Sequence, residues 1–168
     1  MNSDFRDLLK RFNANEVKYL IVGGYAVAEH NVPRYTKDLD IWVKADNQNA
    51  KRVFVALREF GAPLFQVTEN TFAEEGYFYR MGRPPVQVDV LMSVKGLKFE
   101  DAWSNRFETS IDGVSAMFIS KQDLITAKLI SGRSQDLVDA ENLQKAPSST
   151  SLQAYNQVIA QGDKDKKD

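Results

Sequence analysis

The feature that most constrains the fold is a pair of aspartates, Asp38 and Asp40, at the start of an apolar run that follows an earlier apolar run ending at Gly23-Gly24. In a strand, residues i and i+2 point to the same face, so the two carboxylates project together, roughly 7 Å apart. Two neighbouring carboxylates without a partner repel each other and lose hydration. Because a divalent cation bound at about 2.0–2.1 Å can use both, the pair predicts a metal site.

A third acid, Asp89, lies in the aliphatic run VQVDVLM, where a lone aspartate weakens a strand unless it has a partner or a function. If this strand lies beside residues 38–43, the spacing of about 4.8 Å between strands brings Asp89 to the other two acids. Three carboxylates suit two Mg²⁺ ions, with Mn²⁺ as an alternative. Taken alone, an Asp-x-Asp pair more often marks a solvated strand end; the glycines and Asp89 are what favour metal binding.

Gly23 and Gly24 are expected to form a turn, with a short helix starting just after them. A turn without side chains lets phosphate oxygens approach backbone N–H groups and the positive end of the helix dipole. A tight turn without a ligand is the compatible alternative. Together with the acidic cluster, the glycines predict a site for a metal-bridged triphosphate, at which two metals promote in-line displacement of pyrophosphate.

The composition is that of an ordinary folded domain. The chain has 168 residues, 43% hydrophobic and 27% charged, with a net charge of -1, so no overall basic field attracts nucleic acid. The absence of cysteine excludes disulfides and thiolate sites, and a single histidine excludes a multi-histidine metal site. We expect no membrane partner and a cytoplasmic location, because no apolar run approaches the roughly 20 residues of a membrane span and the N-terminus lacks a signal-like segment.

Hydrophobic periodicity and turn residues predict an α+β fold with strands in the middle and helices at both ends. Pro84-Pro85 is expected to make the turn of the central hairpin looser than a two-residue type. The expected helices are 4–15, 47–60, 120–131 and 134–145, and the expected strands are 17–22, 38–44, 77–81, 86–92, 106–111 and 114–119. Residues 146–168 are expected to form a linker, a short helix over 151–161 and a disordered tail.

In its order of motifs the sequence resembles the polymerase-β-type nucleotidyltransferase superfamily, in particular small bacterial enzymes related to abortive-infection and toxin–antitoxin nucleotidyltransferases. The motifs are Gly-Gly, then Arg34-x-Thr36-x-Asp38-x-Asp40, then the isolated Asp89. The segment AKLISGRSQDLVDAENL is similar to the helical segment of those proteins. The resemblance covers roughly residues 16–145. It implies a mixed central sheet flanked by helices in one domain, 1–145, with a catalytic core over about 16–118 and a helical segment over 120–145.

The resemblance also implies roles for individual residues. Asp38, Asp40 and Asp89 would be catalytic and hold the metal ions, and Asp89 would also be the general base on the acceptor hydroxyl. The residues implied in nucleotide or phosphate binding are Gly23, Gly24, Arg34, Thr36, Lys128 and Arg133. One departure is that many members of the superfamily have Gly-Ser, whereas here the second position is Gly24, followed by Tyr25, which bears on nucleotide affinity and the choice of base.

Several of these residues also have structural interpretations. Arg34 and Thr36 can simply hold the loop after Pro33, and Lys128 can be a solvated helix flank. Arg133 can form a salt-bridged helix junction with Asp136 and Asp139. A buried Trp42 is favoured over one that stacks on a base, and a surface or helix-end His30 over a catalyst.

The predicted function is a Mg²⁺-dependent nucleotidyltransferase that moves a nucleoside monophosphate from an NTP to an acceptor hydroxyl and releases pyrophosphate. The acceptor stays open among tRNA, protein and small molecules. The resemblance also suggests a toxin–antitoxin component with a cognate antitoxin or other partner protein. Two alternatives are a catalytically inactive relative that binds a nucleotide or a partner, and a metal-dependent phosphoesterase.

Overall fold

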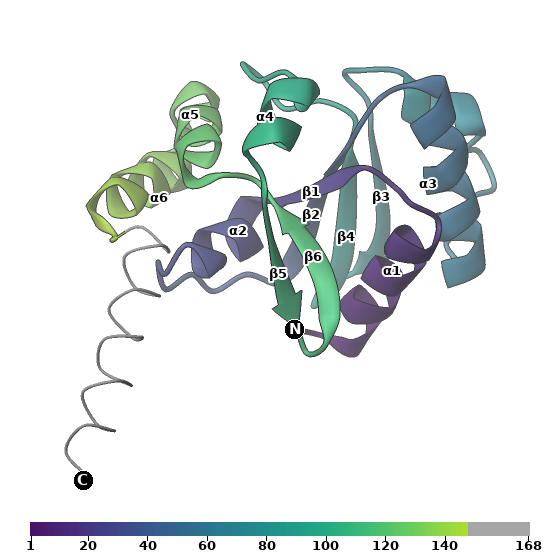
Figure 1. The fold of residues 1–168 in the computed structure, drawn as a ribbon, viewed down its shortest axis with the longest axis horizontal. Coiled ribbons are helices and arrows are strands. Elements are labelled where there is room, and N and C mark those ends of the chain that lie inside the picture. The colour runs from purple at the N-terminus through teal and green to yellow at the C-terminus, as the bar shows by residue number, and fades with distance from the viewer. Residues whose placement is uncertain (148–168) are drawn as a thin grey trace, which may run out of the picture.

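The computed structural model describes residues 1–147, which form a six-stranded sheet with helices around it (Figure 1). The strands lie in the order β3-β4-β2-β1-β6-β5. The elements are α1 (Ser3–Ala14), β1 (Tyr19–Val22), α2 (Gly23–Glu29), β2 (Asp38–Val43), α3 (Asn47–Phe60), the 3₁₀ helix η1 (Glu69–Ala73), β3 (Phe78–Arg83), β4 (Val86–Leu91), α4 (Phe99–Asn105), β5 (Phe107–Ile111), β6 (Val114–Phe118), α5 (Lys121–Ser131) and α6 (Ser134–Lys145).

The sheet is mixed. Strand β2 pairs antiparallel with β1 and parallel with β4, and β1 pairs parallel with β6. The two edges are the antiparallel hairpins β3–β4 and β5–β6. A parallel pair requires a crossover, and the chain between β2 and β4 supplies it with α3, η1 and β3. The α+β fold with a mixed central sheet, predicted from the sequence, is confirmed.

The helices form two groups. Helices α1 and α3 lie at one end of the molecule, while α5 and α6 lie at the other end with α2 (Figure 1). Helix α1 buries Phe5, Leu8, Leu9 and Phe12 in the core. Leu39 and Ile41 of β2 are fully buried in the same core, so Asp38 and Asp40 project from the opposite face of that strand. The acidic pair is therefore held on a strand whose other face is fixed by apolar packing.

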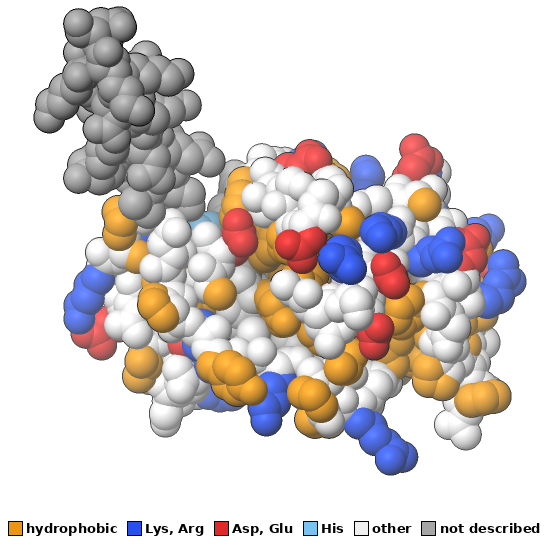
Figure 2. Space-filling model, turned by 90° about the horizontal axis from the view of Figure 1, so that it is seen from below, with side chains coloured by type: hydrophobic (Ala, Val, Ile, Leu, Met, Phe, Trp, Pro, Cys, Tyr) orange, Lys and Arg blue, Asp and Glu red, His pale blue; other side chains and the backbone are white. Residues whose placement is uncertain are grey.

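Surface charges of both signs are interspersed. On the face shown in Figure 2, acidic and basic side chains alternate with hydrophobic ones, without a region of a single sign. This pattern agrees with the net charge of -1. Within residues 1–147 no helix is long and apolar enough to cross a membrane.

Most predicted elements are confirmed, including α3, which ends at Gly61 in the left-handed conformation, and α5, which Ser120 caps. Trp42 is buried against the edge of Phe99, as predicted. His30 lies at the end of α2 as its C-cap, one of the two predicted positions, but it is not on the surface: it is buried, and its Nε2 lies 2.9 Å from the carbonyl oxygen of Ile119.

Two local predictions are corrected. Helix α2 begins at Gly23 itself rather than after the glycines, with Val22 as its extended N-cap. The β3–β4 turn is a two-residue loop, because Arg83 pairs with Val86 and only Pro84-Pro85 remain between them. Gly82 lets the strands close in this way: a Cβ there would lie 2.1 Å from the carbonyl oxygen of Val86.

The sequence analysis missed η1 and α4, whose five and seven residues are too short for a clear helical period. The predicted short helix over 151–161 and the predicted tail lie outside the described residues.

We predict that Asn49→Ala destabilises the fold by about 2 kcal/mol and lowers Tm by roughly 4–8 °C. The buried Asn49 side chain accepts from Lys18 N at 2.8 Å and donates to the carbonyls of Lys18 and Lys44 at 3.0 and 2.9 Å, which ties α3 to the residue before β1 and the residue after β2. The measurement is thermal unfolding followed by circular dichroism. Gln48→Ala, at an exposed neighbour, is the matched control; equal Tm values for the two variants would contradict this account.

Candidate active site

Parallel pairing of β2 and β4 places three acids close together. Asp40 is the register partner of Asp89, and Asp38 is the partner of Gln87. Asp89 therefore lies directly across from Asp40 on the neighbouring strand, as the sequence predicts for adjacent strands. We call Asp38, Asp40 and Asp89 the acidic row.

The acidic row lacks sufficient positive charge. Burial, followed by the charges of Asp89 and Asp38, raises the pKa of Asp40 from 3.8 to about 6. Lys128 and Arg133 oppose this rise but do not cancel it. Asp38 Oδ1 is buried without a hydrogen-bond partner. A buried, unpartnered carboxylate oxygen beside a second carboxylate that is hard to ionise is an environment that fits a hard divalent cation.

Asp89 is held differently from the other two acids. Arg80 of β3 binds it in a bidentate pair, with Nε 2.7 Å from Oδ1 and Nη2 2.8 Å from Oδ2. Gln87 adds a long contact to Oδ1 at 3.4 Å. Within residues 1–147 no group of three His, Cys, Asp or Glu side chains is arranged to hold a metal ion. Among the described residues Asp38 and Asp40 thus have no salt bridge, whereas Asp89 is already paired with Arg80.

The glycine pair packs against the acidic row. Gly23 has φ +64°, and a Cβ there would lie 2.0 Å from Asp40 Oδ2, so no other residue fits beside this carboxylate. A Cβ at Gly24 would lie 2.7 Å from Cβ of Thr36. The start of α2 can approach β2 this closely because both positions lack a side chain.

Arg34 and Thr36 both hold the loop before β2 through contacts within the chain. Arg34 Nε lies 3.2 Å from Asp139 Oδ1, and its Nη1 donates to the carbonyl of Tyr35 at 2.7 Å. The Thr36 hydroxyl donates to the carbonyl of Asp38 at 3.1 Å. These contacts agree with the structural interpretation of the two residues and fix the start of the acidic strand.

Lys128 is part of a buried ion cluster rather than a solvated flank. Its Nζ lies 2.8 Å from both Asp136 and Asp139, which joins α5 to α6. Burial alone would raise the pKa of Asp136, but hydrogen bonds from Lys128, Ser131 and Arg133 outweigh it, and the pKa falls to about 2. The solvated interpretation of Lys128 is therefore wrong. The salt-bridged helix junction predicted around Arg133 is present in part: Arg133 pairs with Asp136, while Asp139 pairs with Lys128 and Arg34.

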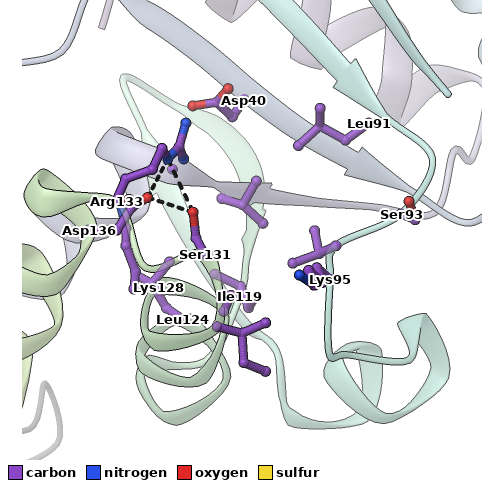
Figure 3. Close-up of a pocket in the computed structure, with 15 residues that line it drawn as sticks. Asp40, Leu91, Ser93, Lys95, Ile119, Leu124, Lys128, Ser131, Arg133 and Asp136 are labelled. Carbon is purple, nitrogen blue, oxygen red and sulfur yellow. Dashed lines mark hydrogen bonds and ion pairs between the residues drawn. The ribbon is translucent and has the colours of Figure 1, made fainter. Parts of the chain in front are cut away.

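A cavity of about 370 Å³ lies between the acidic row and α5 (Figure 3). Arg133, Ser131 and Asp136 form one wall, with the Arg133 guanidinium lying toward Asp40, and Leu91, Ser93 and Lys95 form the opposite wall. Ile119 and Leu124 provide apolar surface between the walls. Arg133 is 79% exposed, so its charge is available to a ligand in the cavity.

The structure brings most, but not all, of the predicted residues to this site. Gly23, Asp40, Lys128 and Arg133 line the cavity. Next to the cavity are Asp38 and Asp89, through the strand register, and Gly24 and Thr36, through their contact with each other. Arg34 instead pairs with Asp139 of α6. The sequence analysis missed Arg80, Ser93 and Lys95. Only Arg80 had a signal in the sequence, because it lies opposite Asp89 when the hairpin loop contains two residues.

Comparisons with known proteins agree with this geometry. Residues 3–165 match the family described as "Nucleotidyltransferase of unknown function (DUF6036)". The chain belongs to this family. The predicted resemblance to nucleotidyltransferases and the prediction of an enzyme of this class are thereby confirmed. Comparison with curated proteins gives no significant match.

Solved nucleotidyltransferases share the fold. The family member is similar to the antibiotic-resistance factor ANT(2'')-Ia, with a TM-score of 0.58, 13% identity, and coverage of 98% of this chain and 95% of that one. It is similar to the lincosamide adenylyltransferase LnuA, with a TM-score of 0.53 and 19% identity, and the match covers 86% of this chain and 96% of that one. It is also similar to a nucleotidyltransferase-like protein of Paracoccidioides brasiliensis, with a TM-score of 0.51 and 17% identity, and the match covers 98% of this chain and 91% of that one.

We predict that Asp40→Asn stabilises the ligand-free protein at pH 7–8. The pKa of Asp40 is about 6 in the folded state and 3.8 in the unfolded chain. Above pH 6 the ionised carboxylate therefore lowers the free energy of unfolding by up to about 3 kcal/mol. The folded state binds the extra proton between these values, so the wild type gains stability as pH falls from 6 to 4 and the difference from the variant shrinks. Urea unfolding at pH 8, 6 and 4 measures this. A destabilised variant at every pH would refute the assignment.

We predict that Lys128→Met destabilises the fold by about 3–5 kcal/mol, because it leaves Asp136 and Asp139 buried without their shared cation. Arg133→Gln should change stability by no more than about 0.5 kcal/mol, because that side chain is largely exposed. Denaturant unfolding of both variants is the measurement. A small loss in Lys128→Met would show that the cluster does not hold the helices together.

Proposed function

We propose that the protein is a Mg²⁺-dependent nucleotidyltransferase that transfers a nucleoside monophosphate from an NTP to an acceptor hydroxyl and releases pyrophosphate. The observation that carries this proposal is the acidic row: Asp40 lies across from Asp89, and Asp38 has a buried oxygen without a partner. Asp38 and Asp40 would hold the cation, with Mn²⁺ as an alternative to Mg²⁺, and Asp89 would complete a site for two ions. Bound cations would neutralise the triphosphate and activate the attacking oxygen.

The other residues of the site would position the reactants. The backbone at Gly23 and Gly24 would contact phosphate oxygens beside Asp40, because Gly23 packs directly against that carboxylate. Arg133 would pair with the phosphates through its exposed guanidinium. Lys128 uses two of its three N–H donors on Asp136 and Asp139, which leaves one for a phosphate oxygen. Asp89 would accept the proton of the acceptor hydroxyl.

The cavity beside Asp40 would hold the nucleoside. Its volume of about 370 Å³ falls in the range of small-molecule sites, and its apolar surface at Leu91, Ile119 and Leu124 suits a base. Arg34 and Thr36 would act on the nucleotide by fixing the loop that leads into β2.

The acceptor is proposed only as a hydroxyl of a tRNA, a protein or a small molecule. Among proteins of this fold, LnuA is known with lincomycin bound and ANT(2'')-Ia with adenylyl-2''-tobramycin. These relatives make ATP the first NTP to test and antibiotic hydroxyls the first acceptors. We also propose that the enzyme acts in the cytoplasm as a toxin–antitoxin component with a cognate antitoxin or other partner protein.

The alternative is a catalytically inactive relative that binds a nucleotide or a partner. Gly24, which stands where many members of the superfamily have serine, favours this alternative. In this structure Thr36 occupies the space that a side chain at position 24 would need, so packing accounts for the glycine. The intact acidic row favours the catalytic function.

We predict that NTP binding depends on Mg²⁺ and is lost in Asp40→Asn. Calorimetric titration of each NTP, with and without Mg²⁺, tests this without knowledge of the acceptor. Asp38→Asn should also weaken binding, by at least about tenfold, because both carboxylates would hold the same cation. Asp46→Asn, at the cap of α3 away from the site, is the matched control and should bind as the wild type does. Equal binding by the wild type and Asp40→Asn would refute the proposal.

A further inference from the structure

The pair between Arg80 and Asp89 is unusual because it occupies a carboxylate of the acidic row. Each carboxylate oxygen accepts one N–H from the guanidinium, at 2.7 and 2.8 Å. Within residues 1–147 no other salt bridge reaches Asp38, Asp40 or Asp89. Arg80 is thus the one cation in direct contact with the row among the described residues.

The charge balance explains why a cation is needed at this position. Asp40 and Asp89 are register partners on adjacent strands and Asp38 lies on the same face, so their three carboxylates repel each other. The guanidinium of Arg80 interacts with the charges of all three, most strongly with that of Asp89. A positive group at the end of the row therefore lowers the repulsion when nothing else is bound.

We propose that Arg80 is a displaceable cation, which holds Asp89 in the ligand-free enzyme and must release it when a divalent cation binds across the acidic row. This inference rests on the proposed cation site. The bidentate pair uses both oxygens of Asp89, and a guanidinium in that position repels a second cation. Cation binding by Asp89 and pairing with Arg80 are therefore competing states of the same carboxylate.

Exposure makes this competition feasible. The Arg80 side chain is 54% exposed, so water takes over its hydrogen bonds when the pair opens. The Lys128 side chain is only 9% exposed, and opening its pairs would leave charges buried. The two ion pairs near the site thus differ in kind: one can open at low cost, and the other is fixed.

The Arg80 side chain also has a second partner besides Asp89. The Arg80 guanidinium already lies 5.5 Å from the ring centroid of Phe78, which is two residues earlier on the same face of β3 and is itself exposed. This cation–π contact can persist when the pair with Asp89 is broken. Arg80 therefore has a second contact that it can keep when it releases the carboxylate.

The test is the affinity for Mn²⁺ without nucleotide, measured by calorimetry on the wild type, Arg80→Gln and Arg83→Gln. Removing the competitor should make Mn²⁺ binding roughly fivefold tighter in Arg80→Gln. Arg83→Gln removes the same charge from the same strand, at a residue without a salt bridge among those described, and should change the affinity by less than about twofold. Circular dichroism checks that both variants are folded.

A second background isolates the contact. In Asp89→Asn, replacement of Arg80 should no longer tighten Mn²⁺ binding, because the competed carboxylate is gone. Equal affinities of the wild type and Arg80→Gln, or equal gains in Arg80→Gln and Arg83→Gln, would overturn the inference while leaving the cation site in place. Absence of Mn²⁺ binding in the wild type and all variants would overturn both the inference on Arg80 and the proposed cation site. Mn²⁺ binding seen only in Arg80→Gln would support the inference on Arg80.

Discussion

The parallel pairing of β2 with β4 is the contact on which the rest of the site depends. Because side chains alternate between the faces of a sheet, a slip of one residue would move Asp89 into the core and expose Val88 or Val90. Val88 and Val90 are buried, as are Leu39 and Ile41 on the paired strand. Apolar packing on one face therefore fixes the register that aligns Asp40 with Asp89 on the other.

The limits of the sequence analysis have the same physical origin. The acids, the glycines and most elements were predictable because they depend on local patterns, and Asp89 because a lone acid among aliphatic residues is conspicuous. Arg80 was missed because its role depends on hairpin register. A looser turn at Pro84-Pro85, as predicted, leaves the cross-strand partner of Arg80 undefined. A two-residue loop pairs Arg83 with Val86, and this register places Arg80 opposite Asp89. The burial of Lys128 was not predictable, since its partners Asp136 and Asp139 come from another helix.

The charges around the site divide into a fixed set and an adjustable set. Lys128, Asp136 and Asp139 are buried together, which holds α5 and α6 in position and supports the wall that carries Arg133. The acidic row is under-compensated, and it is stabilised on one side by a largely exposed arginine. Local instability of this kind is typical of functional sites, where the fold tolerates a cost that a ligand removes.

Packing accounts for Gly24, which stands where the family resemblance leads one to expect a serine. A Cβ at position 24 would lie 2.8 Å from the hydroxyl oxygen of Thr36, so the threonine side chain stands where a serine would project. The hydroxyl beside position 24 is that of Thr36, in the loop before β2. In this structure it donates to the carbonyl of Asp38 and so ties the glycine turn to the first acid of the row. Position 24 and position 36 therefore have to be considered together, because a side chain at one excludes a side chain at the other.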